Sequence, residues 1–211
     1  MMESSPATKR IGIIGGSFDP LHSGHLIIAQ DAADRLGLSE VVFIPAAIPP
    51  HKQHMRQVDA EHRLNMLKRA VEADSRFSVS DIEIQRGGLS YSVDTVKALG
   101  AIHPGADLFL IVGSDTLVEL HTWHRVDELL QMCTVATILR PGVDSLDVIG
   151  RKIQWSEKHK AGLMDHVIAA HRIGISSTEI RQRIAEGRSI RYLVPPEVES
   201  YIYEHGLYQG G

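Results

Sequence analysis

Residues 11–25, IGIIGGSFDPLHSGH, constrain the fold more than any other stretch of the chain. The β-branched run 11–14 predicts a short strand, Gly15-Gly16 a tight turn, and the segment from His22 to His25 the start of an amphipathic helix. In this layout, unpaired backbone N–H groups and the positive helix end converge on an anion. The segment lacks Gly-x-Gly-x-x-Gly and Gly-x4-Gly-Lys-Ser/Thr. It therefore predicts a phosphate-binding loop of another type, although a glycine pair alone is more often only a turn.

Strand-like and helix-like segments alternate along the whole chain. We expect strands over 10–14, 41–44, 77–84, 106–112, 134–139 and 166–170, and helices over 25–36, 59–73, 92–99, 115–131 with a break near Trp123, from Ser176 onward, and from Pro195-Pro196 to Gly206. This order predicts an α/β fold, a doubly wound and mainly parallel sheet of Rossmann-like type with helices on both faces. Ligands of such sheets bind beyond the carboxyl ends of the strands, at the topological switch point.

Three polar loops follow predicted strands and should therefore meet at one edge of the sheet. They carry His22 with His25, His51 with Lys52, and Asp115 after Gly113. Asp115 could accept hydrogen bonds from a ribose, or it could simply be the N-cap of the next helix. His51 and Lys52 could bind a phosphate or be solvated residues after two prolines.

The overall composition limits the possible number of domains, the partners and the location of the protein. A chain of 211 residues with 43% hydrophobic and 23% charged residues predicts one globular domain, which we place at 10–211 after a disordered leader at 1–9. A net charge of −4 argues against nucleic acid as a partner. Cys133 is the single cysteine, so no internal disulfide can form, and we expect a cytoplasmic protein. No apolar run approaches the ~20 residues of a membrane span, so no membrane partner is expected.

A second candidate anion site lies at 175–181, ISSTEIR. Ser176 and Glu179 have the spacing of a capping box, which predicts a helix start. The serines of this helix start supply N–H and O–H donors, and Arg181, one turn further, adds a permanent positive charge. A capped helix with a solvated arginine would have the same pattern.

Two segments together resemble a known superfamily. GGSFDPLHSGHL is similar to the (H/T)xGH signature of the nucleotidylyltransferases, and 175–181 is similar to their ISSTxIR element. The segments 49–52, 90–95, 113–117, Trp123 and 192–195 resemble bacterial nicotinate-nucleotide adenylyltransferase. The resemblance extends from about Arg10 to Tyr208, with Ser17 and Ser92 in places where threonine is common.

This resemblance implies a reaction in which nicotinate mononucleotide and ATP give deamido-NAD and pyrophosphate, with Mg²⁺ carried by the ATP phosphates. The 5′-phosphate attacks the α-phosphorus in line, so catalysis is positioning and charge neutralisation. A polyphosphate beside the two histidines should favour protonated imidazoles. The alternatives are pantetheine-phosphate adenylyltransferase and a non-catalytic nucleotide-binding regulator of the same fold. A protein-bound zinc is disfavoured because the twelve histidines lack zinc-like spacings with Cys or carboxylates.

The resemblance also implies roles for individual residues. The catalytic residues would be His22, His25 and Arg181. ATP would be bound by Gly16, Ser17, Phe18, His22, His25, Gly113, Asp115, Ser176, Ser177 and Arg181. The mononucleotide would be bound by Ser17, His51, Lys52, Asp94, Thr95 and Trp123. By residue type alone, Trp123 is more often a core residue, and Asp94 and Thr95 more often cap a helix.

Overall fold

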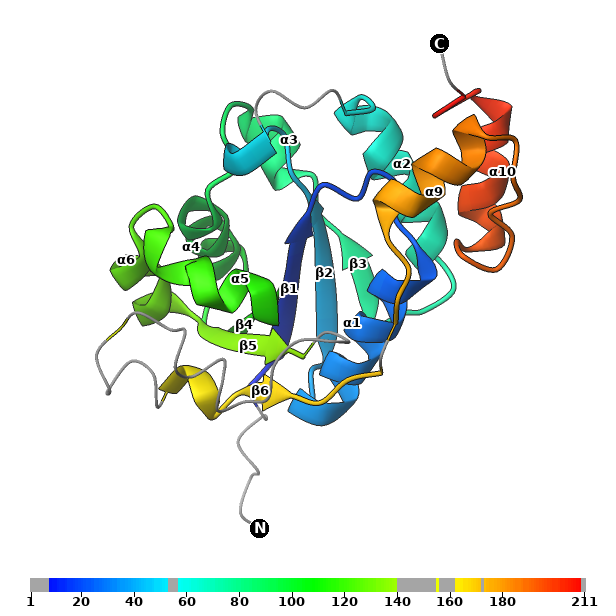
Figure 1. Cartoon of the computed structure of the whole chain (residues 1–211). Helices are drawn as coiled ribbons and strands as arrows, with labels where there is room; N and C mark the ends of the chain where they lie inside the picture. The colour runs from blue at the N-terminus through cyan, green and yellow to red at the C-terminus, as the bar shows by residue number, and fades with distance from the viewer. Residues whose placement is uncertain (1–7, 53–56, 140–154, 156–161, 172, 210–211) are drawn as a thin grey trace.

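The computed structural model describes residues 8–52, 57–139, 155, 162–171 and 173–209 (Figure 1). Within these residues, six parallel strands form one sheet in the order β3-β2-β1-β4-β5-β6. The strands are β1 Arg10–Gly16, β2 Glu40–Pro45, β3 Phe77–Val79, β4 Asp107–Gly113, β5 Thr134–Ile138 and β6 Val167–Ile168. The doubly wound α/β prediction is confirmed, and the strand order reverses between β1 and β4, which makes that junction the switch point.

Helices cover both faces of the sheet (Figure 1). They are α1 Ser23–Leu36, α2 Ala60–Val71, α3 Ile82–Arg86, α4 Ser92–Ile102, α5 Ser114–Glu119, α6 Val126–Met132, α9 Ser177–Ala185 and α10 Pro196–Glu204, with 3₁₀ turns η1 Pro50–Lys52 and η2 Leu120–Thr122. None of the helices in the described segments is long and apolar enough for a transmembrane span. The break expected near Trp123 is confirmed, because that residue ends η2 before α6 begins.

Two hydrophobic cores lie on opposite faces of the sheet, because both sides of each central strand are buried. Phe43 and Ile111 pack with α1, α2, α9 and α10, whereas Ile13 and Leu110 pack with α4, α5 and α6. Successive strand residues therefore alternate between two apolar environments, which is why the central strands have nearly continuous apolar sequences. On α4, Val93, Val96 and Leu99 are buried in the second of these cores.

The strand predicted over 77–84 is wrong in its second half. β3 ends at Val79, and Ile82–Arg86 form the one-turn helix α3. The sequence FSVSDIEI alternates throughout, but a helix of this length is too short for a 3.6-residue period to be visible. Ser80 N–H still donates to the Phe43 carbonyl at 3.0 Å, so the chain leaves the sheet just beyond this bond.

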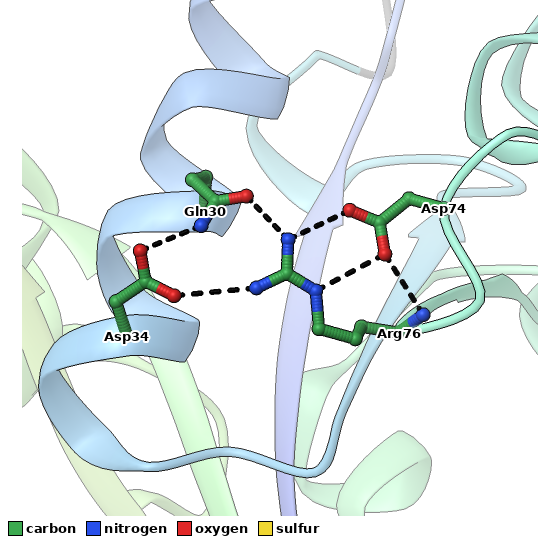
Figure 2. Close-up of polar contacts among 4 residues, drawn as sticks. All are labelled: Gln30, Asp34, Asp74 and Arg76. Carbon is green, nitrogen blue, oxygen red and sulfur yellow. Dashed lines mark hydrogen bonds and ion pairs between the residues drawn. The ribbon is translucent and has the colours of Figure 1, made fainter.

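An exposed polar cluster holds α1 against the amino edge of the sheet (Figure 2). Arg76, the residue before β3, donates to Asp34 on α1 at 3.2 Å and to both carboxylate oxygens of Asp74, at 2.8 and 3.1 Å. It also bonds Gln30 of α1. Such exposed pairs contribute little stability. The cluster lies at the edge opposite the carboxyl ends of the strands.

The predicted leader lies mostly outside the described residues, because these begin at residue 8. Lys9 Nζ donates to the Glu40 carboxylate at 2.6 Å, and the Lys9 backbone carbonyl accepts from the Asp107 N–H at 2.9 Å. Residues 143–154 and 156–161, for which the sequence predicts no element, also lie outside the described part.

Candidate active site

The β1–α1 loop begins the site at the switch point. His22, only 7% exposed, is the N-cap residue of α1, and His25 lies one turn later. The two imidazole rings are stacked, with centroids 3.7 Å apart and planes 25° apart, and the edge of Phe18 meets His25 at 5.1 Å. The helix start predicted over His22 to His25 is confirmed, and it brings the two histidines to one side of the loop.

One hydrogen bond determines the tautomer of His25. The backbone N–H of His22 donates to Nδ1 of His25 at 3.2 Å. A backbone N–H is only a donor, so Nδ1 must carry a lone pair, and the ring proton is on Nε2. His25 therefore accepts at Nδ1 and carries its N–H donor on Nε2. The expectation that a bound polyphosphate favours protonated imidazoles concerns the ATP complex and stays a prediction.

The glycine between the two histidines leaves room for this stack. A Cβ added at Gly24 would lie 3.0 Å from Nδ1 of His22 and 3.0 Å from Cγ2 of Ile173. A larger residue would therefore push the His22 ring or the segment that leads to α9. This contact explains why the motif needs a glycine next to the second histidine.

The second motif lies directly against the first. Ser176 Oγ accepts from the Glu179 N–H at 3.1 Å, which confirms the predicted helix start. Ser177 Oγ donates to the Pro20 carbonyl at 2.9 Å, and Arg181 Nη1 donates to the Asp19 carbonyl at 2.6 Å. Segments about 160 residues apart thus meet at one loop, with α9 lying beside the end of β1 (Figure 1).

A buried polar cluster under the loop was not predicted from the sequence. Asp19 is 5% exposed, and its Oδ1 accepts from the Tyr208 hydroxyl at 2.8 Å and from the Val58 N–H at 3.4 Å. Burial and the neighbouring Asp19 carboxylate raise the pKa of the Tyr208 phenol far above its ordinary value, so Tyr208 remains a donor. These bonds tie the β1–α1 loop to the segment before α2 and to the segment after α10.

Arg63 of α2 belongs to the same region. It is 2% exposed, and its guanidinium donates to backbone carbonyls of the chain. Burial lowers the pKa of Arg63, and the Asp19 carboxylate opposes that change. A sequence signal existed, because Arg63 precedes the buried Met66 and Leu67 by three and four residues and so shares their helix face.

The β4 loop lies next to the β1 loop because the two strands are neighbours. Gly113 is the N-cap residue of α5, and Asp115 is exposed in its first turn. The alternative in which Asp115 is the N-cap is therefore wrong. The expected convergence of the loops after β1 and β4 is confirmed.

The loop after β2 borders the other side of β1. The Ala46 N–H donates to the Gly16 carbonyl at 2.9 Å, and His51 is exposed on η1. The side chain of Lys52 lies outside the described part of the structure. The Ala47 N–H donates to Ser90 Oγ at 2.9 Å, which ties this loop to the segment that enters α4.

The residues expected on α4 and near α6 have partners within the protein. Thr95 is 3% exposed, and its hydroxyl donates to Glu83 at 2.6 Å. Burial raises the pKa of this Glu83 carboxyl. Asp94 pairs with Arg125 at 3.6 Å. Trp123 is half-buried against the α4–α6 core, so part of its ring remains accessible.

The donors gathered around the β1–α1 loop are imidazole, hydroxyl and guanidinium groups. Such groups suit phosphate oxygens better than they suit Mg²⁺, which prefers oxygen ligands. Within the described ranges, no group of three or more His, Cys, Asp or Glu side chains could hold a metal ion.

Comparison with known proteins agrees with this geometry. The family model for cytidylyltransferase-like proteins matches residues 13–183, so the fold is that of a nucleotidyltransferase. A probable nicotinate-nucleotide adenylyltransferase of Desulfitobacterium hafniense is 42% identical, with 99% of this chain and 100% of the relative covered. One of Trichlorobacter lovleyi is 41% identical over 95% of this chain and 99% of the relative. The chain belongs to the nicotinate-nucleotide adenylyltransferase family.

Solved structures show the same fold at low sequence identity. The Plasmodium falciparum nicotinic acid mononucleotide adenylyltransferase complexed with NaAD is 20% identical and superposes with a TM-score of 0.76, covering 96% of this chain and 98% of that one. The same protein complexed with APC gives a TM-score of 0.74.

Proposed function

We propose that the chain transfers the adenylyl group of ATP to nicotinate mononucleotide, giving deamido-NAD and pyrophosphate in NAD biosynthesis. The observation that carries the proposal is the contact of Ser177 and Arg181 with the loop that presents His22 and His25. Imidazole, hydroxyl and guanidinium donors thereby surround one loop, as a triphosphate requires. The names of the relatives at 41–42% identity support this choice of substrates.

The chain's own residues supply positioning and charge neutralisation. A mononucleotide phosphate oxygen forms a bond to the α-phosphorus while the bond from that phosphorus to the pyrophosphate oxygen breaks, so no protein nucleophile is needed. His22 and His25 donate to α- and β-phosphate oxygens. Ser176, Ser177 and Arg181 hold the β- and γ-phosphates, where negative charge accumulates as pyrophosphate leaves.

The remaining predicted residues divide between the two nucleotides. Gly16, Ser17 and Phe18 let the backbone approach the triphosphate, with Gly113 beside them at the end of β4. Asp115, exposed there, accepts from a ribose hydroxyl.

On the mononucleotide side, His51 and Lys52 hold the phosphate, and the accessible part of Trp123 stacks on the pyridine ring. Asp94 and Thr95 position the same nucleotide through the start of α4. Because the Thr95 hydroxyl is buried with Glu83, its role is to hold that helix start in place.

Magnesium enters as part of MgATP, held by phosphate oxygens and water. It neutralises phosphate charge when bound.

The single cysteine, Cys133, forms no internal disulfide, which suits a protein of the reducing cytoplasm.

Pyrophosphate release tests the proposal. With ATP and Mg²⁺, we expect turnover with nicotinate mononucleotide and none above background with phosphopantetheine. Turnover with phosphopantetheine alone would favour pantetheine-phosphate adenylyltransferase. ATP binding without turnover on either acceptor would favour a regulator.

A further inference from the structure

The guanidinium of Arg63 joins three separate segments of backbone. Nη1 donates to the Ser17 carbonyl at 2.8 Å, Nη2 to the Ala46 carbonyl at 2.7 Å and Nε to the Val58 carbonyl at 3.0 Å. Arg63 is among the largest fully buried side chains of the described residues. Each of its three nitrogens thus holds a different part of the chain.

Two of these segments border the two proposed substrate sites. Ser17 belongs to the loop that we assign to the triphosphate. Ala46 begins the segment that leads from β2 to His51 and η1, which we assign to the mononucleotide phosphate. One direct bond, from the Ala46 N–H to the Gly16 carbonyl at 2.9 Å, joins the same two segments. Arg63 therefore helps to set the separation of the two loops.

The cost of this arrangement argues for a role beyond filling space. Burying a guanidinium requires desolvation, which neutral carbonyls compensate only in part, and apolar side chains of similar volume are often as stabilising at such positions. Its helix neighbours Met66 and Leu67 are apolar and fully buried. A planar group with diverging N–H donors is needed to bond three carbonyls at once.

We infer that Arg63 is a positioning residue that sets the distance between the ATP loop and the mononucleotide loop, and so aligns the attacking phosphate with the α-phosphorus. This inference rests on the proposed function. Arg63 acts through the Ser17 and Ala46 carbonyls and does not touch substrate. Misalignment of two bound substrates destabilises the transition state more than it destabilises either substrate complex. Replacement of Arg63 should therefore lower kcat and leave KM nearly unchanged.

The test compares Arg63→Lys and Arg63→Met with Arg76→Lys and Arg76→Met. Lysine keeps the charge, but its single nitrogen cannot span three carbonyls. Arg76 is a matched control, because it also makes several hydrogen bonds but lies at the amino edge of the sheet. The measurements are kcat, KM for each substrate, Kd for a non-hydrolysable ATP analogue and the melting temperature.

For Arg63→Lys we expect kcat to fall by about tenfold or more, with both KM values and the analogue Kd within about threefold of wild type. The Arg76 variants should keep kcat within about twofold. If Arg63→Met does not fold, the comparison of Arg63→Lys with Arg76→Lys decides the test. Wild-type kcat in Arg63→Lys, or a loss confined to one KM, would overturn the inference.

A failure of the proposed function is distinguishable from a failure of this inference. If the wild type uses phosphopantetheine instead, the same comparison of kcat with KM is made with that acceptor. If the wild type turns over neither acceptor, the readout is hydrogen exchange of the Ala46 amide, which is bonded to Gly16. Faster exchange in Arg63→Lys than in Arg76→Lys supports the coupling of the loops, and equal exchange refutes it.

Discussion

Replacing His25 separates its structural contact from its proposed catalytic one. Nδ1 accepts the His22 N–H, while the Nε2–H is the donor that we assign to the phosphates. His25→Ala removes both. His25→Glu removes the imidazole, but an ionised glutamate at the third helical position can still accept from the N-cap N–H and has no donor of its own. Both variants therefore lose the catalytic donor, and only one loses the helix cap.

The contacts set the expected magnitudes. Loss of the capping bond costs about 1 kcal/mol of unfolding free energy. Loss of the ring contacts with His22 and Phe18, at 3.7 and 5.1 Å, costs about 0.5–1.5 kcal/mol more. At about 2–4 °C per kcal/mol for a chain of this size, His25→Ala should melt roughly 3–10 °C below wild type. His25→Glu should melt about 2–4 °C above His25→Ala, because it keeps the cap.

The catalytic loss should be at least as large in His25→Glu as in His25→Ala, because both lack the donor and the carboxylate also repels the phosphates. Removal of one donor to transition-state charge lowers kcat by about 10²–10³, equivalent to about 2.7–4 kcal/mol. Pyrophosphate release under saturating substrates measures kcat, and calorimetry or circular dichroism measures the melting temperature. Near-wild-type kcat in His25→Ala or His25→Glu would remove His25 from the mechanism. Equal melting temperatures for the two variants would refute the assigned tautomer and its cap.

Three other predictions concern residues around the site. Trp123→Ala should raise KM for the mononucleotide by roughly 2- to 12-fold and leave KM for ATP nearly unchanged, since aromatic stacking contributes about 0.5–1.5 kcal/mol; the reverse pattern would place Trp123 elsewhere. Burial raises the pKa of Glu83, so the folded protein binds this proton more tightly than the unfolded chain. Urea unfolding should therefore show Glu83→Gln gaining stability relative to wild type as pH rises from about 4 to 7, and a pH-independent difference would contradict this. Burial raises the pKa of Cys133 to about 12, so iodoacetamide should label the native thiol far more slowly than the urea-unfolded one, and rapid native labelling would show that the thiol is accessible.

Features with strong local signals were predictable from the sequence. The apolar run that became β4 and the capped start of α9 depend on neighbouring residues, so periodicity and capping chemistry were sufficient. The parallel order of the strands then placed the loops after β1 and β4 at one edge. α3 was missed because five residues show no clear period.

The polar cluster beneath the loop could not be predicted in the same way. Asp19 pairs with a hydroxyl 189 residues away, and Arg63 with a carbonyl 46 residues away. Local patterns contain no information on such pairs, which depend on how α2 and the segment after α10 pack. The helix face on which Arg63 lies could be predicted from the sequence, but its hydrogen-bond partners could not. The roles assigned to His51, Lys52, Asp94 and Trp123 stay predictions.

The bond between Tyr208 and Asp19 also has a consequence for biosynthesis. At translation rates of about 5–20 residues per second, the tyrosine is made roughly 10–40 s after the aspartate that it will meet. During that interval, the Asp19 carboxylate lacks the Tyr208 hydroxyl, one of the donors that it has in the folded protein. The β1–α1 loop therefore gains its contact with Tyr208 only after the ribosome has added residue 208.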